Sequence, residues 1–186
     1  MITNIYLVRH AHSAYTPDEL NRPLSSKGFE AAEKVAALLL EENINLIIAS
    51  PYKRAIQTVE GLTKTLNLDI QIEEAFRERK LSENPVEDFE NSIIRVWQDF
   101  TFIFEGGESG LEAQSRGAKA ILRILRKYSG KNIAIGTHGN IMVLIMNYFN
   151  SSYDYDFWTT LKMPDIYKLS FDGEKLIKVQ RIWKED

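Results

Sequence analysis

The feature of this chain that most constrains its fold is an alternation of short apolar runs with longer amphipathic stretches. Runs rich in Ile, Leu, Val or Ala occupy residues 4–9, 45–49 and 132–136, and each run is too short for a helix. Continuous apolar runs of this kind are typical of strands that are covered on both faces. Residues 26–42 instead place apolar side chains at helical spacing, with charged side chains opposite. This repetition predicts a parallel sheet with right-handed crossovers.

The rest of the chain extends the pattern. Further helices are expected from about Pro51 to Leu66, with Ser50 as N-cap, and within 86–104. Two more are expected from the capping box Ser109–Glu112 through Lys127 and over Ile141–Phe149. A further short strand is expected over Asp69–Glu73. The runs Ile166–Phe171 and Leu176–Trp183 flank Asp172-Gly173, a turn pair typical of an antiparallel hairpin. We therefore expect an α/β fold, a three-layer sandwich with a mostly parallel central sheet, helices on both faces and a C-terminal antiparallel hairpin.

Nothing in the chain indicates a linker, an internal repeat or a domain boundary. The 186 residues fit a single domain over 1–186. Residues at about 79–108 depart from the strand–helix alternation, so we expect a helical insertion there. Its aromatic residues Trp97, Phe100, Phe102 and Phe104 have two possible uses, lining one side of a ligand site or packing in the core, and we expect core packing.

Composition excludes several classes of function. With no cysteine, the chain has no disulfide, no thiolate metal site and no cysteine nucleophile, which fits the cytoplasm. Residues Met1 to Val8 lack the basic start of a secretion signal, and no apolar run approaches the ~18 residues of a membrane helix. A net charge of −3 argues against a nucleic-acid partner. Any cationic site must therefore be local.

Histidine and arginine gather where the predicted strands end. His10 and His12 follow the first strand and His138 follows the fourth. Ligands of open α/β sheets bind outside the carboxyl ends of the strands, so His10 and His138 can converge although they are far apart in the chain. Arg9 precedes His10, and Arg54 falls in the first turn of a helix, where free N–H groups favour an anion. Together they predict a phosphate-sized cationic site.

These residues belong to an ordered set of motifs that spans most of the chain. The motifs are Leu7-Val8-Arg9-His10-Ala11-His12-Ser13, Pro23-Leu24-Ser25-Ser26-Lys27-Gly28, Ser50-Pro51-Tyr52-Lys53-Arg54-Ala55-Ile56-Gln57-Thr58, Phe76-Arg77-Glu78, Gly106-Gly107-Glu108-Ser109 and Thr137-His138-Gly139. As a set they resemble the histidine phosphatase superfamily, also called phosphoglycerate mutase-like. The chain lacks the longer insertions of the glycolytic mutases, which points to a small phosphatase-type member.

The resemblance implies a phosphomonoester hydrolase that acts on a small phosphorylated metabolite and needs no metal or other cofactor. His10 would attack phosphorus and form a phosphohistidine, while Arg9, Arg54 and His138 hold the phosphoryl oxygens. Glu78 would protonate the leaving oxygen and then take a proton from the attacking water. Ser13, Ser109 and Gly139 would also contact the substrate.

Other roles remain open for four residues of these motifs. Glu78 could be a solvated charge in a loop of mixed sign, and Ser109 is first of all a helix cap. His10-x-His12 resembles the first metal pair of amidohydrolase barrels, but such a barrel needs about 250 residues. Only His138 would remain to complete a metal shell. We expect His12 at the rim of the site.

Two alternative functions also remain open. A phosphoglycerate-type mutase would return the phosphoryl group to another hydroxyl of the substrate instead of to water. A phospho-ligand sensor of another class would bind phosphate without turnover. Gly106-Gly107 lacks the lysine of a P-loop, which argues against a nucleoside triphosphatase. Neither the physiological substrate nor the oligomeric state follows from the sequence.

Overall fold

The computed structural model describes residues 1–184 of the chain. In chain order its elements are β1 (Ile2–Arg9), α1 (Ser26–Leu40), β2 (Leu46–Ala49), α2 (Lys53–Val59), α3 (Gly61–Leu66), β3 (Ile70–Ile72), the 3-10 helix η1 (Glu74–Phe76), α4 (Phe89–Gln98), α5 (Gly110–Lys127), β4 (Asn132–Thr137), α6 (Gly139–Phe149), α7 (Tyr155–Thr160), β5 (Asp165–Asp172) and β6 (Lys175–Arg181). Within these residues six strands form one sheet in the order β3-β2-β4-β1-β5-β6. The first four of these run parallel, and β5 is antiparallel to both β1 and β6.

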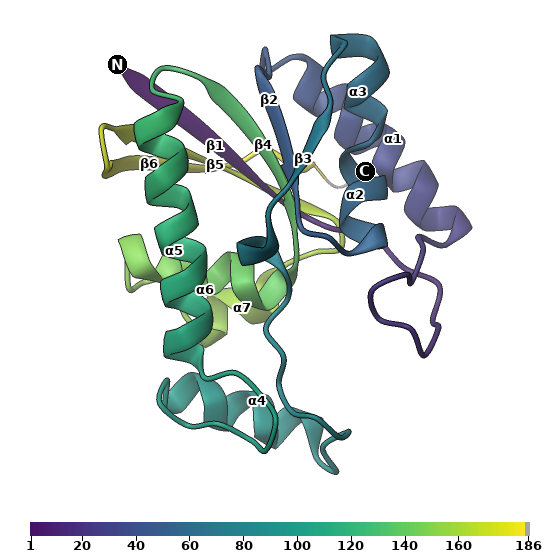
Figure 1. Cartoon of the computed structure of the whole chain (residues 1–186), viewed down its shortest axis with the longest axis vertical. Coiled ribbons are helices and arrows are strands. Elements are labelled where there is room, and N and C mark those ends of the chain that lie inside the picture. The colour runs from purple at the N-terminus through teal and green to yellow at the C-terminus, as the bar shows by residue number, and fades with distance from the viewer. Residues whose placement is uncertain (185–186) are drawn as a thin grey trace.

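Alternate side chains of the central strand β1 enter two different cores, because successive residues of a strand point to opposite faces. Ile5 and Leu7 pack in a core with residues of α5 and α6. Tyr6 and Val8 pack in a second core with residues of α1 and α3. Helices therefore cover both faces of the sheet, as Figure 1 shows. The expected α/β sandwich with its C-terminal hairpin is confirmed.

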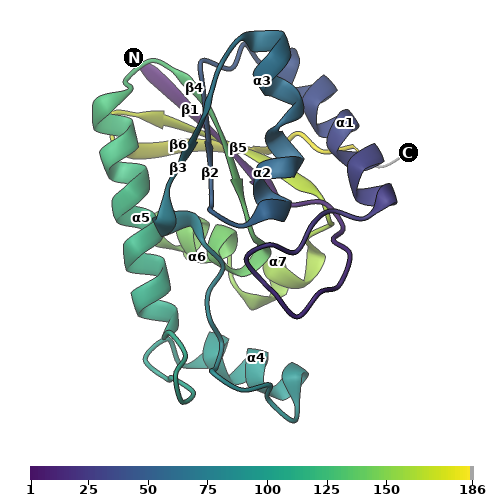
Figure 2. The same ribbon diagram turned by 45° about the vertical axis from the view of Figure 1, so that its right-hand side comes forward.

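Two segments lie beyond the end of the sheet where the parallel strands finish. One is the loop of residues 10–25 after β1, and the other runs from η1 through α4 to the start of α5 (Figures 1 and 2). Helix α4 is shorter than the helical stretch expected over 86–104. Phe102 and Phe104 follow it outside any helix and pack against the same core as Trp97.

The helix expected from Pro51 to Leu66 differs from the structure in two ways. It is divided into α2 and α3 at Glu60, and it begins at Lys53. Ser50 is not the N-cap: Tyr52 holds that position and makes no side-chain cap. The physical reason is that the Ser50 hydroxyl contacts the imidazole of His138 instead.

Helix α7 has no counterpart among the predicted elements. It is six residues long, and its sequence Tyr-Asp-Phe-Trp-Thr-Thr is aromatic and β-branched, so it carries no helical periodicity. A cap fixes its start, since the side chain of Asp154 accepts a hydrogen bond from the Phe157 N–H at 3.2 Å. No helix within residues 1–184 is long and apolar enough to cross a membrane.

Candidate active site

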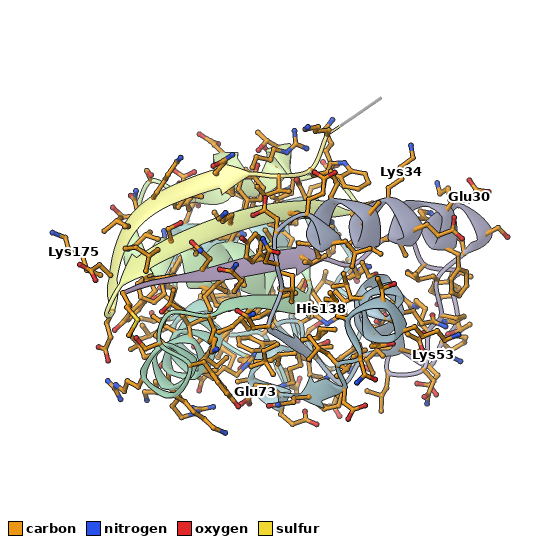
Figure 3. All side chains as sticks on the ribbon, turned by 90° about the horizontal axis from the view of Figure 1, so that it is seen from above. Glu30, Lys34, Lys53, Glu73, His138 and Lys175 are labelled. Carbon is orange, nitrogen blue, oxygen red and sulfur yellow. The ribbon has the colours of Figure 1, made fainter. Side chains whose placement is uncertain are left out.

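The parallel strands bring His10, Ser50 and His138 side by side, because each residue directly follows one of three neighbouring strands. The His10 N–H donates to the Thr137 carbonyl at 2.9 Å, and the Ser50 N–H donates to the Gly136 carbonyl at 2.9 Å. The two imidazole rings meet edge to face with centroids 5.2 Å apart. Figure 3 shows His138 in the middle of the molecule, far from the charged side chains at its periphery.

The hydrogen bonds of His10 define which ring nitrogen is free to react. Nδ1 lies 2.8 Å from the carbonyl oxygen of Ala11, which can only accept, so Nδ1 carries the proton. Arg54 Nε donates to His10 Nε2 at 3.3 Å, which requires a lone pair on Nε2. Both contacts assign the same tautomer. Nε2 is therefore the nucleophilic nitrogen.

Burial keeps both imidazoles neutral at physiological pH. Desolvation lowers the pKa of His10 to about 3, with the positive charges of Arg54 and Arg9 acting in the same direction and the Ala11 bond opposing them. Desolvation likewise holds the pKa of His138 well below its ordinary value, helped by His10 and Arg54. A neutral imidazole is the form that can attack phosphorus.

This shift predicts a loss of stability in acid. Folded His10 stays neutral down to about pH 3, whereas the unfolded residue takes a proton near its ordinary pKa of 6.5. The unfolded state therefore binds more protons between these values, and the stability present above pH 6.5 is lost as pH falls through this window. From pH 7 to pH 5 the free energy of unfolding should fall by about 2 kcal/mol through His10.

Urea unfolding of the wild type and of His10→Gln at both pH values measures this contribution, since all other titrating groups are common to the two proteins. The variant should show the smaller fall. Equal falls in the two proteins would contradict a depressed pKa at His10.

The tautomer of His138 depends on Ser50. The Ser50 hydroxyl lies 2.7 Å from His138 Nε2 and accepts a long hydrogen bond from the Tyr52 N–H at 3.4 Å. The Ser50 hydroxyl has a proton to donate to Nε2, and in the tautomer that accepts it the imidazole proton is on Nδ1. Nδ1 is buried and has no hydrogen-bond partner within residues 1–184. A buried N–H of this kind is a ready donor to an anionic oxygen.

Arg9 lies against the start of α6. Its Nη1 donates to the carbonyls of Leu161 and Lys162, both at 3.1 Å. A Cβ at position 139 would lie 2.9 Å from Arg9 Nε, so Gly139 is what allows the guanidinium to approach the helix. Arg9 Nε is buried without a partner in the part of the chain that the structure describes.

Arg54 is placed by contacts that the sequence did not indicate. Its Nη1 donates to the backbone carbonyl of Glu19 at 2.8 Å, and its Nη2 lies 3.2 Å from the Glu19 carboxylate. Arg22 Nη2 lies 2.7 Å from the same carboxylate. Arg54 does lie in the first turn of α2, as expected, but Ser50 does not cap that helix. The available signal for the missed residues was that Arg22 directly precedes the Pro23-Leu24-Ser25 motif.

Glu78 reaches the same region from the segment after η1. The Thr137 hydroxyl anchors this segment by donating to the Phe76 carbonyl at 2.8 Å. The Glu78 carboxylate accepts three backbone N–H groups: Arg79 and Ile141 at 2.9 Å on Oε1, and Asn140 at 3.1 Å on Oε2. It is therefore fixed at the first turn of α6, next to His138.

The structure does not bring Ser13, Ser109 and His12 to the two histidines by any hydrogen bond within residues 1–184. Ser109 forms the predicted capping box with Glu112. Ser13 lies in an isolated bridge with Leu24. His12 is exposed, and its Nδ1 lies 2.8 Å from the Ser25 hydroxyl. No group of three or more histidine, aspartate or glutamate side chains in this range could hold a metal ion.

One protein family matches nearly the whole chain. Residues 5–182 match the profile of the histidine phosphatase superfamily (branch 1). The chain belongs to this superfamily. The prediction of a histidine phosphatase is thereby confirmed at the level of the family.

Named relatives agree with the assignment. Phosphoserine phosphatase 1 of Hydrogenobacter thermophilus is 25% identical over 150 residues, which are 74% of this chain and 71% of the relative. A provisionally named phosphoserine phosphatase 2 of the same organism is 31% identical over 84 residues, so the match spans 42% of this chain and only 41% of that relative. A mycobacterial glucosyl-3-phosphoglycerate phosphatase has the same fold, with a TM-score of 0.78, 18% identity and 97% of each chain covered.

Proposed function

We propose that the protein hydrolyses small phosphomonoesters and carries the phosphoryl group on His10 Nε2 between the two half-reactions. The observation that carries the proposal is the state of that nitrogen: it is unprotonated, it faces Arg54, and the His138 ring lies beside it. A neutral nucleophile bordered by buried cations suits an anionic electrophile.

In the first half-reaction, the Nε2 lone pair attacks phosphorus and the bond to the leaving oxygen breaks. Arg9, Arg54 and the Nδ1–H of His138 offset the charge on the phosphoryl oxygens. Glu78 supplies the proton that the leaving oxygen needs. Its Oε2 accepts a single backbone hydrogen bond within residues 1–184, whereas Oε1 accepts two, so Oε2 is the oxygen with room for that proton.

In the second half-reaction, a water molecule attacks the phosphohistidine. Glu78 takes the proton of that water, the N–P bond breaks, and its electron pair returns to Nε2. Inorganic phosphate and the starting form of His10 are the products. All of these steps use side chains of this chain alone.

The relatives' names favour hydrolysis over the mutase and sensor alternatives, since all three are phosphatases. We place the whole chain, 1–186, in a single catalytic domain with its insertion at about 79–108. The absence of cysteine and the net charge of −3 fit a cytoplasmic enzyme of small metabolites that has no nucleic-acid partner.

The proposal predicts release of p-nitrophenol from p-nitrophenyl phosphate, with no isomerisation of 3-phosphoglycerate. Vanadate should inhibit, because its five-coordinate form mimics the in-line transition state that the arginines and His138 stabilise. Exhaustive dialysis against EDTA should leave the rate unchanged. A colorimetric assay with and without each additive measures the release of p-nitrophenol and the effects of vanadate and EDTA, and separate product analysis of a 3-phosphoglycerate incubation measures isomerisation.

Other outcomes contradict parts of the proposal. Isomerised 3-phosphoglycerate would indicate the mutase, and phosphate binding without turnover would indicate the sensor. An EDTA-inactivated enzyme that zinc or manganese restores would revive the reading of His10-x-His12 as metal ligands.

A further inference from the structure

We infer that Arg22 is a third arginine of the phosphoryl site, and that Glu19 is an internal anion that occupies the site until a phosphomonoester replaces it. The inference rests on the proposed transfer of a phosphoryl group to His10. Glu19 bridges two guanidiniums, with Oε2 at 3.2 Å from Arg54 Nη2 and Oε1 at 2.7 Å from Arg22 Nη2.

This bridge lies next to the nucleophile. The same Arg54 that holds the Glu19 carboxylate reaches His10 Nε2 through its Nε at 3.3 Å. Two arginines thus converge on one anionic group beside the nitrogen that is to be phosphorylated. The charge of Arg22 is also close enough to contribute to the lowered pKa of His10.

The burial of the three side chains indicates which of them can leave. The Arg54 and Arg22 side chains are 7% and 16% exposed, whereas the Glu19 side chain is 56% exposed. A buried guanidinium without an anion is costly, so the two arginines require a negative partner. A carboxylate that already faces water gives up such a partner at little cost. The exchange of Glu19 for a phosphoryl group therefore keeps a negative partner for the two buried arginines and costs the exposed carboxylate little.

The arginines keep their positions when the carboxylate leaves. Arg54 Nη1 is bonded to the backbone carbonyl of Glu19, which does not move with the side chain. Arg22 donates to the Thr16 carbonyl from Nε at 3.1 Å and from Nη2 at 2.7 Å, and its Cζ lies 4.8 Å from the centre of the Tyr15 ring. Rotation of the Glu19 side chain alone is thus enough to open the site.

This arrangement gives the two residues opposite effects on affinity. Phosphate gains a ligand from Arg22, but its apparent affinity is reduced by the fraction of molecules in which Glu19 still holds the arginines. Removing the charge of Glu19 should therefore tighten phosphate binding. Removing the guanidinium of Arg22 should weaken it.

The test measures the binding of inorganic phosphate and of vanadate by calorimetry, together with their inhibition of p-nitrophenyl phosphate turnover. Arg22→Gln should bind both anions roughly tenfold more weakly or worse, since a charge-assisted hydrogen bond is lost. Glu19→Gln should bind them roughly two- to fivefold more tightly, the range of an exposed ion pair. Arg126→Gln and Glu174→Gln, from an exposed ion pair remote from the site, make the same charge changes and should match the wild type.

The opposite effects of the two substitutions on anion affinity distinguish the inference from a purely structural role of Glu19 and Arg22. If the bridge only braces the loop, Glu19→Gln and Arg22→Gln will weaken binding together, and the inference is overturned. Unchanged affinity in Arg22→Gln overturns it as well. Arg22→Lys keeps the charge but loses the planar fork, and should bind phosphate with intermediate affinity. Direct binding needs no turnover, so failure of the proposed hydrolysis would show separately as a wild type that binds phosphate but forms no phosphohistidine.

Discussion

Replacing His10 by alanine should lower kcat for p-nitrophenyl phosphate by about 10⁴-fold or more, because no neighbour can supply the covalent step. The only other imidazole at the site, His138, has its Nε2 engaged by the Ser50 hydroxyl. The wild type, quenched during turnover of a ³²P-labelled substrate, should carry label that is lost in acid and stable in base, as a phosphoramidate is. The variant should carry none.

His12→Ala is the matched control for this experiment. His12 is two residues away and exposed, and its hydrogen bond is to Ser25, the N-cap of α1, so the control should retain both label and turnover. Circular dichroism should show that both variants remain folded. Label on a serine, or full activity in His10→Ala, would reject the phosphohistidine mechanism.

Glu78→Gln should lower the rate of phosphoryl transfer to His10 more for a substrate whose leaving oxygen needs a proton than for one whose leaving oxygen does not. An alkyl phosphate should lose the roughly 10²–10⁴-fold that general acid catalysis contributes, while p-nitrophenyl phosphate should lose much less in the first step. Gln keeps the size of the side chain but carries no transferable proton. Single-turnover measurement of phosphoryl transfer onto His10 with the two substrates isolates this step from the hydrolysis of the intermediate.

Glu83→Gln, an exposed carboxylate on the same segment, is the control for this substitution and should leave both rates unchanged. Equal rate losses with the two substrates in Glu78→Gln would mean that Glu78 is not the acid. Glu108 would be a poor replacement, because its carboxylate is bonded to Arg116 at 2.6 and 2.8 Å and to Arg77 at 3.3 Å.

Much of the fold could be predicted because local patterns encode it. The short apolar run of β1 indicates a buried strand, and the helical spacing of apolar residues in α1, with charged residues opposite, indicates an amphipathic helix. Asp172-Gly173 marks the hairpin between β5 and β6. The capping box of α5 was also readable, since Ser109 and Glu112 satisfy each other within a single helical turn. Helix α7 was not readable, because its six residues carry no periodicity and only packing and the Asp154 cap define it.

The sequence also predicted that His10 and His138 lie at one end of the sheet, because each directly follows a strand and parallel strands finish at a common edge. It could not assign the partners of the side chains there. Ser50, which the local pattern makes a helix cap, instead contacts His138, 88 residues further along the chain. Glu78 is held by the N–H groups of Asn140 and Ile141, and Arg54 by Glu19, none of them near in sequence. The sequence by itself determined that His10 and His138 directly follow parallel strands and so lie at one edge of the sheet. Only the tertiary structure decided which atoms they contact, because hydrogen bonds and ion pairs depend on distances through space that no local period encodes.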